Sequence, residues 1–248
     1  MDLMEVVYLK IAVDIGHNIP NNLGAKSLGD ENAMVADVGE RLAARLRASG
    51  YEVQMVAPLR ALSVSDSLIQ RVVKANEGRA DLFVSIHMNA GGGSGTEVWI
   101  GSEGGRYIGE KIAGSISGLG FRNRGVKLQG KDGKGLYVLK HTEMTAVLVE
   151  GCFVDSKSDM ELYNAERMAF AIWRGIVAGL NRVQARPLLR LGSEYRNEVT
   201  HLQTLLGISA DGIFGPETEK AVRKFHRESG IQVDGIVGPQ TWGRIMLK

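Results

Sequence analysis

Hydrophobic positions over residues 1–180 alternate between two patterns. Short apolar runs that suit buried strands are separated by longer stretches in which apolar side chains recur every three or four residues. The strand pattern occurs at residues 6–14, 51–56, 82–87, 96–100, 136–139 and 146–150. The helix pattern occurs at residues 31–48, about 65–76, 105–117 and 158–180. This alternation predicts an α/β domain, with a mostly parallel sheet and helices on both of its faces.

The end of the chain shows a different pattern, which is built on an internal repeat. The segment Asp211–Thr218 recurs as Asp234–Thr241, with the shared form Asp-Gly-Ile-x-Gly-Pro-x-Thr. Asp-Gly favours a turn, and a proline that follows glycine suits the first position of a helix. Helices are expected at about 195–206, at 216–229 and from Pro239. The sequence therefore predicts a small all-α domain of three helices.

The distribution of charge separates these two parts of the chain. The chain has 248 residues, of which 44% are hydrophobic, and this is enough for two globular domains. Residues 1–180 carry a net charge of −1 and residues 193–248 are neutral, so the overall charge of +2 comes from three arginines within 181–192. We expect a catalytic domain over 1–180, a linker over 181–192 and a helical domain over 193–248.

Composition and charge exclude several classes of protein. A single cysteine cannot form an internal disulfide, and the small net charge gives no basic signature for nucleic acid. The longest apolar runs fall well short of the roughly 18 residues that a membrane helix needs. The first residues lack the basic and apolar regions of a secretory signal. We therefore expect a protein that neither binds nucleic acid nor inserts into a membrane. We also expect a monomer.

Ionisable residues follow the predicted strands. His17 follows the first strand, His87 ends the strand at 82–87, and Glu150 ends the strand at 146–150, while Glu31 begins the helix at 31–48. Ligands of open α/β sheets bind beyond the carboxyl ends of the strands. Two imidazoles and one carboxylate with an open fourth position form a typical catalytic zinc site. A further carboxylate that does not bind the metal can act as general base and then as general acid.

The spacing of these residues leaves a purely structural interpretation open. His17 and His87 are too far apart in the chain to match any short zinc motif, so both could cap strand ends. Glu31 could stabilise the positive end of a helix dipole. Glu150 could pair with a nearby Arg or Lys.

Several motifs within residues 1–180 resemble one enzyme family. They occur in the family's order and are Asp14-Ile-Gly-His17, Glu31, Ser85-Ile-His-Met-Asn-Ala90, Asn123-Arg-Gly-Val-Lys127, Leu136-Tyr-Val-Leu139 and Met144-Thr-Ala-Val-Leu-Val-Glu150. Over residues 10–180 the sequence resembles the zinc-dependent N-acetylmuramoyl-L-alanine amidases of the Amidase_3 type. That family cleaves the amide that joins the lactyl group of N-acetylmuramic acid to L-alanine in peptidoglycan.

The resemblance implies a role for each matching residue. One catalytic zinc ion is expected on His17, Glu31 and His87, with Glu150 as the general base and acid. The expected substrate-binding residues are Asn89, Lys127, Leu136 and His141. For Lys127 a solvated charge, and for His141 a surface-loop position, are the alternative interpretations.

Two positions depart from the family's pattern. Asn18 follows His17 where the family often has glycine, and Glu150-Gly-Cys-Phe153 stands where the family usually has Glu-Thr-Gly-Phe. Cys152 lies two residues from Glu150 and could share its side of the strand. We expect Cys152 to be a small buried thiol, with a thiol near the metal as the alternative.

The repeat at the end of the chain resembles the peptidoglycan-binding type 1 domain over residues 195–246. In one departure, His226 stands where that family commonly has glutamine. We expect His226 and His201 to be structural. The resemblance implies a cell-wall anchor, which would raise the local concentration of substrate. Bacterial peptidoglycan is thus the expected substrate and the expected anchor.

Two other functions stay open, together with the cellular setting. A zinc peptidase could cut within the stem peptide, although the sequence has no His-Glu-x-x-His motif. A wall-binding protein without catalytic activity is the other alternative. Because no signal peptide is seen, we expect a phage or prophage endolysin made in the host cytoplasm, or a lytic enzyme of the mother cell.

Overall fold

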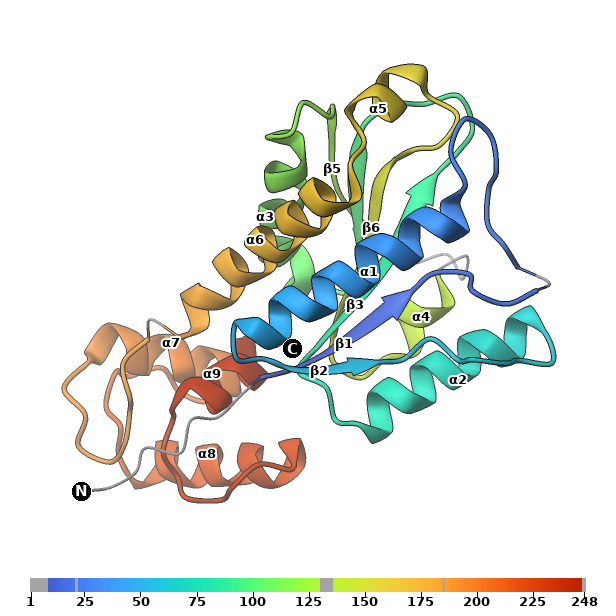
Figure 1. Cartoon of the computed structure of the whole chain (residues 1–248). Helices are drawn as coiled ribbons and strands as arrows, with labels where there is room; N and C mark the ends of the chain where they lie inside the picture. The colour runs from blue at the N-terminus through green and yellow to red at the C-terminus, as the bar shows by residue number, and fades with distance from the viewer. Residues whose placement is uncertain (1–8, 21, 130–135, 185, 247–248) are drawn as a thin grey trace. The chain divides into compact units, whose positions relative to one another are not determined.

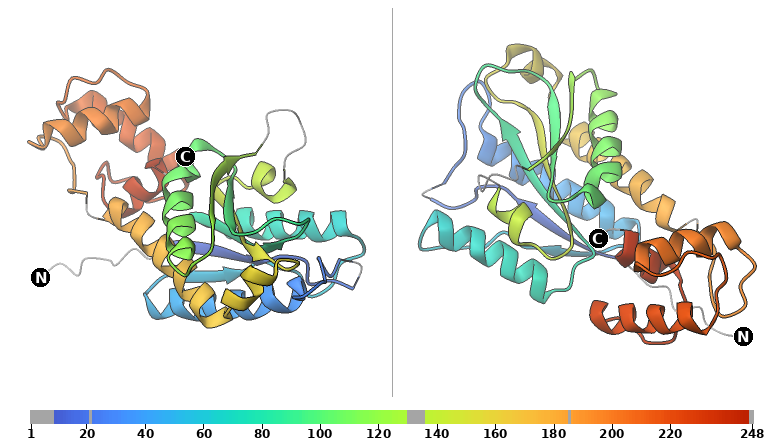
Figure 2. Two further views of the ribbon diagram at one scale, coloured as in Figure 1. Left: turned by 90° about the horizontal axis from the view of Figure 1, so that it is seen from above. Right: turned by 180° about the vertical axis from the view of Figure 1, so that it is seen from behind.

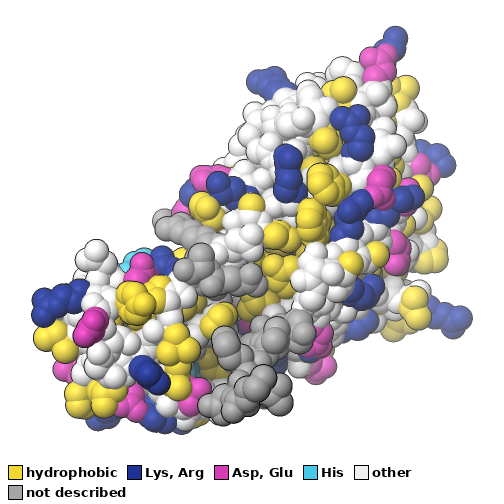
Figure 3. Space-filling model, turned by 60° about the vertical axis from the view of Figure 1, so that its left-hand side comes forward, with side chains coloured by type: hydrophobic (Ala, Val, Ile, Leu, Met, Phe, Trp, Pro, Cys, Tyr) yellow, Lys and Arg dark blue, Asp and Glu magenta, His cyan; other side chains and the backbone are white. Residues whose placement is uncertain are grey.

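The computed structural model describes residues 9–20, 22–129, 136–184 and 186–246 (Figure 1). The chain divides into two compact units, one over Leu9–Gly179 and one that includes Leu180–Lys248. None of the helices in the described residues combines the length and the apolar character that a membrane-spanning helix requires. Basic and acidic side chains are interspersed on the face shown in Figure 3.

A six-stranded sheet forms the centre of the first unit, with the strand order β2-β1-β3-β6-β4-β5 (Figure 1). The strands are β1 (Lys10–Ile15), β2 (Glu52–Met55), β3 (Leu82–Asn89), β4 (Thr96–Ile100), β5 (Asn123–Leu128) and β6 (Thr145–Phe153). Neighbouring strands run parallel, except that β4 is antiparallel to β6. The prediction of a mostly parallel sheet is therefore confirmed.

Helices cover both faces of this sheet, as predicted (Figure 2). They are α1 (Glu31–Ala48), α2 (Val64–Glu77), α3 (Arg106–Ser117), α4 (Tyr137–His141), α5 (Lys157–Leu162) and α6 (Ala165–Gln184), with a 3-10 turn at Glu103–Gly105. On one face, α2 and α4 contribute Val72 and Leu139 to a buried cluster with Phe83 of the sheet. On the other face, α1 packs against β1 and β3, and α3 packs against β4 and β5.

Helix α1 shows how the sequence specifies one of these elements. Asp30 caps its N-terminus, and the Asp30 side chain accepts a hydrogen bond from the backbone N–H of Ala33 at 3.2 Å. Val35, Val38 and Leu42 recur at helical spacing, and all three are fully buried. Capping and burial together fix the first residue of the helix, Glu31, at the edge of the sheet.

The structure corrects two of the predicted elements and adds one strand that was not predicted. Residues 136–139, predicted as a strand, belong to α4 and the residue before it, because a four-residue apolar run suits a strand and a buried helical turn equally well. Strand β5 was not predicted, because it is a half-buried edge strand with polar residues. The predicted helix 158–180 is two helices, α5 and α6. They are separated at Asn164, whose side chain accepts a hydrogen bond from the backbone N–H of Arg167 at 3.0 Å.

Three helices form the second unit, at the positions that the repeat predicts. They are α7 (Arg196–Leu206), α8 (Pro216–Ser229) and α9 (Pro239–Met246). Their apolar faces enclose a core that includes Val199, Leu202, Phe214, Val222, Phe225, Val237, Trp242 and Ile245. The prediction of a three-helix domain is therefore confirmed.

In both copies of the repeat, one polar side chain bonds to the threonine and lies close to the aspartate. In the first copy, Gln203 Nε2 donates to Asp211 Oδ1 at 2.7 Å and to Thr218 Oγ1 at 2.9 Å. In the second copy, His226 stands at the position equivalent to Gln203, with its Nε2 3.0 Å from Thr241 Oγ1 and its Nδ1 3.6 Å from Asp234. His226 is 1% exposed, and burial lowers its pKa. The histidine therefore takes the structural place of a glutamine.

Much of the predicted linker lies within this second unit. Leu189 is fully buried in its core and pairs with Val237 through two backbone hydrogen bonds. The backbone carbonyl of Pro187 accepts a hydrogen bond from Trp242 Nε1 at 3.0 Å. Residues 181–184 continue α6. The domain boundaries at 180 and 193 stay a prediction.

We predict that Trp242→Ala unfolds the second unit. Trp242 is fully buried, and truncating a buried aromatic side chain costs about 3–5 kcal/mol, which is comparable to the whole stability of a domain this small. The loss is measured as urea-induced loss of helical circular dichroism in the whole chain. Ile213→Ala is the matched control, because Ile213 in the same unit is 55% exposed. Equal stability of the two variants would contradict the role of this core.

Candidate metal centre and catalytic site

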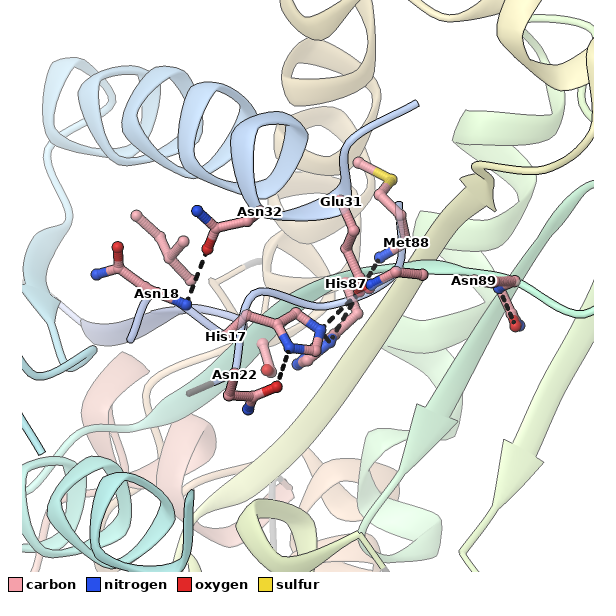
Figure 4. Close-up of polar contacts among 12 residues, drawn as sticks. His17, Asn18, Asn22, Glu31, Asn32, His87, Met88 and Asn89 are labelled. Atoms are coloured by element: carbon pink, nitrogen blue, oxygen red, sulfur yellow. Dashed lines mark hydrogen bonds and ion pairs between the residues drawn. The ribbon is translucent and has the colours of Figure 1, made fainter. Parts of the chain in front are cut away.

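Three side chains that the sequence places far apart meet at the carboxyl ends of β1 and β3. The Nε2 of His17 lies 2.9 Å from Glu31 Oε1 and 3.2 Å from Nδ1 of His87 (Figure 4). The His87 Nδ1 lies 3.3 Å from the same Glu31 oxygen. Because β1 and β3 are adjacent and parallel, their ends bring both histidines to one edge of the sheet, where α1 begins.

These three atoms suit a tetrahedral metal ion. Zinc bonds of about 2.0–2.1 Å to nitrogen and oxygen put neighbouring ligands roughly 3.3 Å apart on the edges of a tetrahedron. The observed separations of 2.9, 3.2 and 3.3 Å are close to that value. Within the described residues, His17, Glu31 and His87 form a group that could hold a metal ion.

Hydrogen bonds orient the side chains of His17 and Glu31 toward the position that a metal ion would occupy. The Nδ1–H of His17 donates to Asn22 Oδ1 at 2.8 Å, which leaves the lone pair of Nε2 directed at the cluster (Figure 4). Glu31 Oε2 accepts from the backbone N–H of Ala25 at 2.8 Å, and Oε1 accepts from that of Met88 at 3.0 Å. The Glu31 side chain is therefore fixed by backbone donors on both oxygens.

The same contacts shift the protonation equilibria of the cluster. Burial opposes ionisation of Glu31, but its hydrogen bonds to His17 and His87 outweigh burial and hold its pKa well below the usual range. Burial also acts to lower the pKa of His17, and the hydrogen bonds to Glu31 and Asn22 reverse that effect, so its pKa is raised. The carboxylate is thus ionised and ready to bind a cation.

The backbone that carries His17 adopts an unusual conformation. His17 and Asn18 have φ values of 59° and 64°, in the left-handed region that disfavours side chains with a Cβ. The backbone N–H of Asn18 donates to Asn32 Oδ1 of α1 at 2.9 Å (Figure 4). At Gly16 a Cβ would lie 2.5 Å from the ring of His87. Only glycine therefore allows β1 to approach the second histidine so closely.

A buried arginine of α2 forms hydrogen bonds with the backbone that leads to His17. Arg71 is 2% exposed, and its guanidinium donates to Asp14 Oδ1 and to the backbone carbonyls of Ile15 and His17. The other oxygen of Asp14 accepts from the hydroxyl of Ser85 on β3 at 2.7 Å. One side chain thus joins α2, β1 and the residue that carries the first imidazole.

Glu150 of β6 lies beside the three-residue cluster. It is the direct cross-strand neighbour of His87 on β3 and of Glu97 on β4. Its Oε2 is buried and has no hydrogen-bond partner in the described part of the chain. Burial raises the pKa of Glu150 to about 7, with Glu31 and Glu97 adding to the rise and the two histidines opposing it. This carboxyl can therefore accept and release a proton near neutral pH.

Of the expected substrate-binding residues, two lie near Glu150. Lys127 Nζ pairs with Glu97 Oε2 at 2.5 Å, and Asn89 Nδ2 lies 3.4 Å from the other Glu97 oxygen. Leu136 and His141 lie at the two ends of α4, where the ring of His141 packs on Tyr137 at 4.3 Å. In the residues that the structure describes, no hydrogen bond or ion pair joins these two to the cluster.

Sequence reasoning did not single out Arg71 or Glu97. The sequence nevertheless contains a signal for both. Each is a charged residue at a position that the hydrophobic periodicity of its helix or strand assigns to the buried face. Arg71 precedes the buried Val72 of α2, and Glu97 lies within the apolar strand 96–100. Charged residues are almost never fully buried unless they are paired, so both positions pointed to a partner.

Cys152 is a buried thiol, as expected, and it does not share the side of Glu150. Its Sγ lies 3.7 Å from the Met88 sulfur, and burial raises the pKa of the thiol. The pairing of β3 with β6 shifts by one residue between His87 and Asn89, so Gly151 and Cys152 both oppose Met88. Because this bulge interrupts the alternation of faces, Cys152 follows Met88 rather than Glu150.

A family model described as N-acetylmuramoyl-L-alanine amidase matches residues 11–182, which include all the residues of this site. The chain belongs to the N-acetylmuramoyl-L-alanine amidase family. A second model, for a peptidoglycan binding domain, matches residues 195–245. The two matches fall on the α/β unit and on the three-helix repeat.

Related sequences include named amidases and an endolysin. The chain is 32% identical to the amidase CwlM of Bacillus licheniformis over 70% of this chain and 68% of CwlM. It is 31% identical to the endolysin of Bacillus phage SPP1 over 69% of this chain and 64% of that protein. An uncharacterized 38.4 kDa protein of Clostridium perfringens is 35% identical over 70% of this chain. The chain spans about half the length of the Clostridium perfringens relatives that it matches.

Solved structures of amidase domains share the fold of the first unit. The catalytic domain of the CD27L endolysin, which targets Clostridium difficile, aligns with a TM-score of 0.63 at 26% identity, over 69% of this chain and 98% of that domain. The amidase AmiC2 of Nostoc punctiforme aligns with a TM-score of 0.61 at 29% identity, over 70% and 98% of the two chains.

We predict that Arg71→Met destabilises the α/β unit by about 3–5 kcal/mol, because it leaves Asp14 as an unpaired buried charge. The control is Val72→Ala in the same helix turn, which removes buried apolar volume and no hydrogen bond to the His17 backbone. The free energy of unfolding is measured by denaturant titration of the metal-free chain. A loss for Arg71→Met no larger than that for Val72→Ala would show that the ion pair contributes little.

Proposed function

We propose that this chain hydrolyses the amide bond between N-acetylmuramic acid and the L-alanine of the peptidoglycan stem peptide. The observation that carries the proposal is Glu150, a half-buried carboxyl group beside the cluster of two imidazoles and one carboxylate, whose buried Oε2 has no hydrogen-bond partner among the described residues. Membership of the amidase family and the match to a peptidoglycan binding domain support this choice of substrate.

His17, Glu31 and His87 would hold one zinc ion. Two neutral imidazoles and a carboxylate suit zinc, and the separations of their ligand atoms fit its tetrahedral geometry. Zinc, when bound, polarises a carbonyl group and lowers the pKa of water to about 7. Asn22 holds His17 in the tautomer that such binding requires.

Glu150 would transfer the proton. Its carboxylate accepts a proton from the attacking water and passes that proton to the nitrogen of the departing L-alanine. Burial raises the pKa of Glu150 and so makes its carboxylate a stronger proton acceptor, which favours the first of these steps. The strand register places Glu150 directly opposite His87, one of the proposed metal ligands.

The three-helix unit would anchor the enzyme to the cell wall. Its family match supports binding to peptidoglycan, and tethering raises the effective concentration of substrate around the α/β unit. Because residues 193–248 carry no net charge, attraction to the wall would depend on shape and hydrogen bonding more than on charge.

Two cellular settings fit this activity, a phage endolysin and a lytic enzyme of the mother cell. The relatives support both. They include the endolysin of Bacillus phage SPP1 and a sporulation-specific amidase of Bacillus subtilis, which is 30% identical over 70% of this chain. Either setting places the site of action at bacterial peptidoglycan.

We predict that Glu150→Gln lowers the rate of hydrolysis by about 10²–10⁴-fold, because the amide cannot accept the proton of water. Zinc content and the circular dichroism spectrum should stay those of the unaltered chain. Glu110→Gln is the matched control, since Glu110 is an exposed residue of α3. Activity is measured by mass spectrometry of digested peptidoglycan.

The products of that digestion separate the candidate functions. New N-terminal L-alanine supports the amidase, whereas cleavage between two amino acids supports a zinc peptidase. Wall binding without any cleavage would indicate a binding protein. Full activity of Glu150→Gln would contradict the role proposed for this residue.

We predict that the chain binds one zinc ion and that His87→Ala weakens binding more than about 100-fold, because it removes one of three ligands. Zinc affinity is measured by competition with a chromogenic chelator. His201→Ala in the three-helix unit is the control. Chelation should abolish hydrolysis and added zinc should restore it, and unchanged affinity in His87→Ala would rule out this site.

A further inference from the structure

We propose that Arg124 and Lys127 of β5 form a subsite for a carboxylate of the stem peptide, on the amine side of the scissile bond. The inference rests on the proposed function and adds to it a preference among peptidoglycan substrates. The subsite carries a positive charge, and the ligand class that it selects is a peptide with a free carboxylate near its attachment to the sugar.

One buried carboxylate holds both cations in place. Glu97 is 3% exposed, and its Oε2 accepts from Arg124 Nε at 2.6 Å and from Lys127 Nζ at 2.5 Å. Its Oε1 accepts from Trp99 Nε1 at 3.1 Å and lies 3.4 Å from Asn89 Nδ2. Glu97, Arg124 and Lys127 together therefore carry a net charge of +1.

Both cations keep donors available for a ligand. The side chains of Arg124 and Lys127 are 30% and 34% exposed. Only Nε of Arg124 bonds to Glu97. In the described residues no acceptor is bonded to its two terminal nitrogens, which form the fork that binds a carboxylate.

Aromatic rings hold the two cations in a fixed orientation. Arg124 lies over the ring of Phe153 at 4.9 Å, and Lys127 lies over the ring of Trp99 at 5.1 Å. A subsite held by a buried anion and by two rings loses little conformational freedom when a ligand binds.

The distance of Arg124 and Lys127 from Glu150 determines which carboxylate of the stem peptide the two cations can bind. Glu97 pairs with Glu150 across β4 and β6, and Lys127 pairs with Trp99 across β5 and β4, so these side chains share one face. β5 is two strands from β6, about 10 Å away. An extended peptide advances about 3.4 Å per residue, so the reachable carboxylate belongs to the second or third residue of the stem peptide.

A comparison of two substrates tests this inference. They are soluble, uncrosslinked glycan strands whose stem peptides carry either free carboxylates or carboxamides on both the second and the third residue, with no free carboxylate elsewhere. The zinc-loaded full chain should cleave the acid with a kcat/KM about 10-fold higher than the amide, since a charge-assisted hydrogen bond is lost in the amide. The ratio should fall toward one as salt is raised.

Variants of the two cations provide the second readout. Arg124→Gln and Lys127→Gln should each reduce the ratio of acid to amide cleavage at least threefold. Arg106→Gln is the matched control, because this arginine of α3 loses the same charge but pairs with Glu103. Its ratio should stay at the value of the unaltered chain.

Each outcome decides between the two proposals. Equal cleavage of acid and amide by the unaltered chain would overturn the subsite and leave the amidase function intact. A preference that survives in both variants would also overturn the subsite. Failure to cleave either substrate would overturn the proposed function. Because the first comparison uses the unaltered protein, it stays decisive even if a variant does not fold.

Discussion

The buried guanidinium of Arg71 is the contact on which the geometry of the site depends. It donates to Asp14 and to the carbonyls of Ile15 and His17, and so connects α2 to the end of β1. His17 has a left-handed backbone conformation, which costs free energy for a residue with a Cβ. The hydrogen bond from Arg71 to the His17 carbonyl offsets part of that cost. The whole α/β unit therefore contributes to the position of one imidazole, since Arg71 itself is held in place only when α2 packs against the sheet.

The order of the strands supplies the second half of the site. β6 lies between β3 and β4, so Glu150 has His87 on one side and Glu97 on the other. Burial next to a second carboxylate favours the protonated form of Glu150, and the cations on Glu97 hold that neighbour ionised. A single bulge in the same strand pair directs Cys152 away from this face. Strand order and register thus determine the protonation of Glu150 and the position of Cys152, which the residue types alone do not determine.

The three-helix unit shows how a repeat tolerates a substitution. Gln203 and His226 occupy equivalent places in the two copies, and each forms a hydrogen bond with the threonine of its own repeat. Gln203 also bonds to Asp211, whereas His226 Nδ1 lies 3.6 Å from Asp234. An imidazole can replace an amide there because both offer a nitrogen at a comparable reach. The departure at His226 is therefore explained by hydrogen bonding within the fold, and it needs no functional role.

The sequence by itself determined the α/β class, the three helices of the repeat and most element positions, because periodicity and turn residues are local signals. It also placed His17, His87 and Glu150 near the carboxyl ends of their strands, although β3 and β6 continue two and three residues beyond His87 and Glu150. It could not separate a strand from a helix at 136–139, and it missed β5, since a short apolar run and a polar edge strand carry weak local signals. Only tertiary structure decided the partners of Arg71 and Glu97 and the side on which Cys152 lies. Those outcomes depend on strand order, register and a bulge, which arise from contacts between residues far apart in the chain.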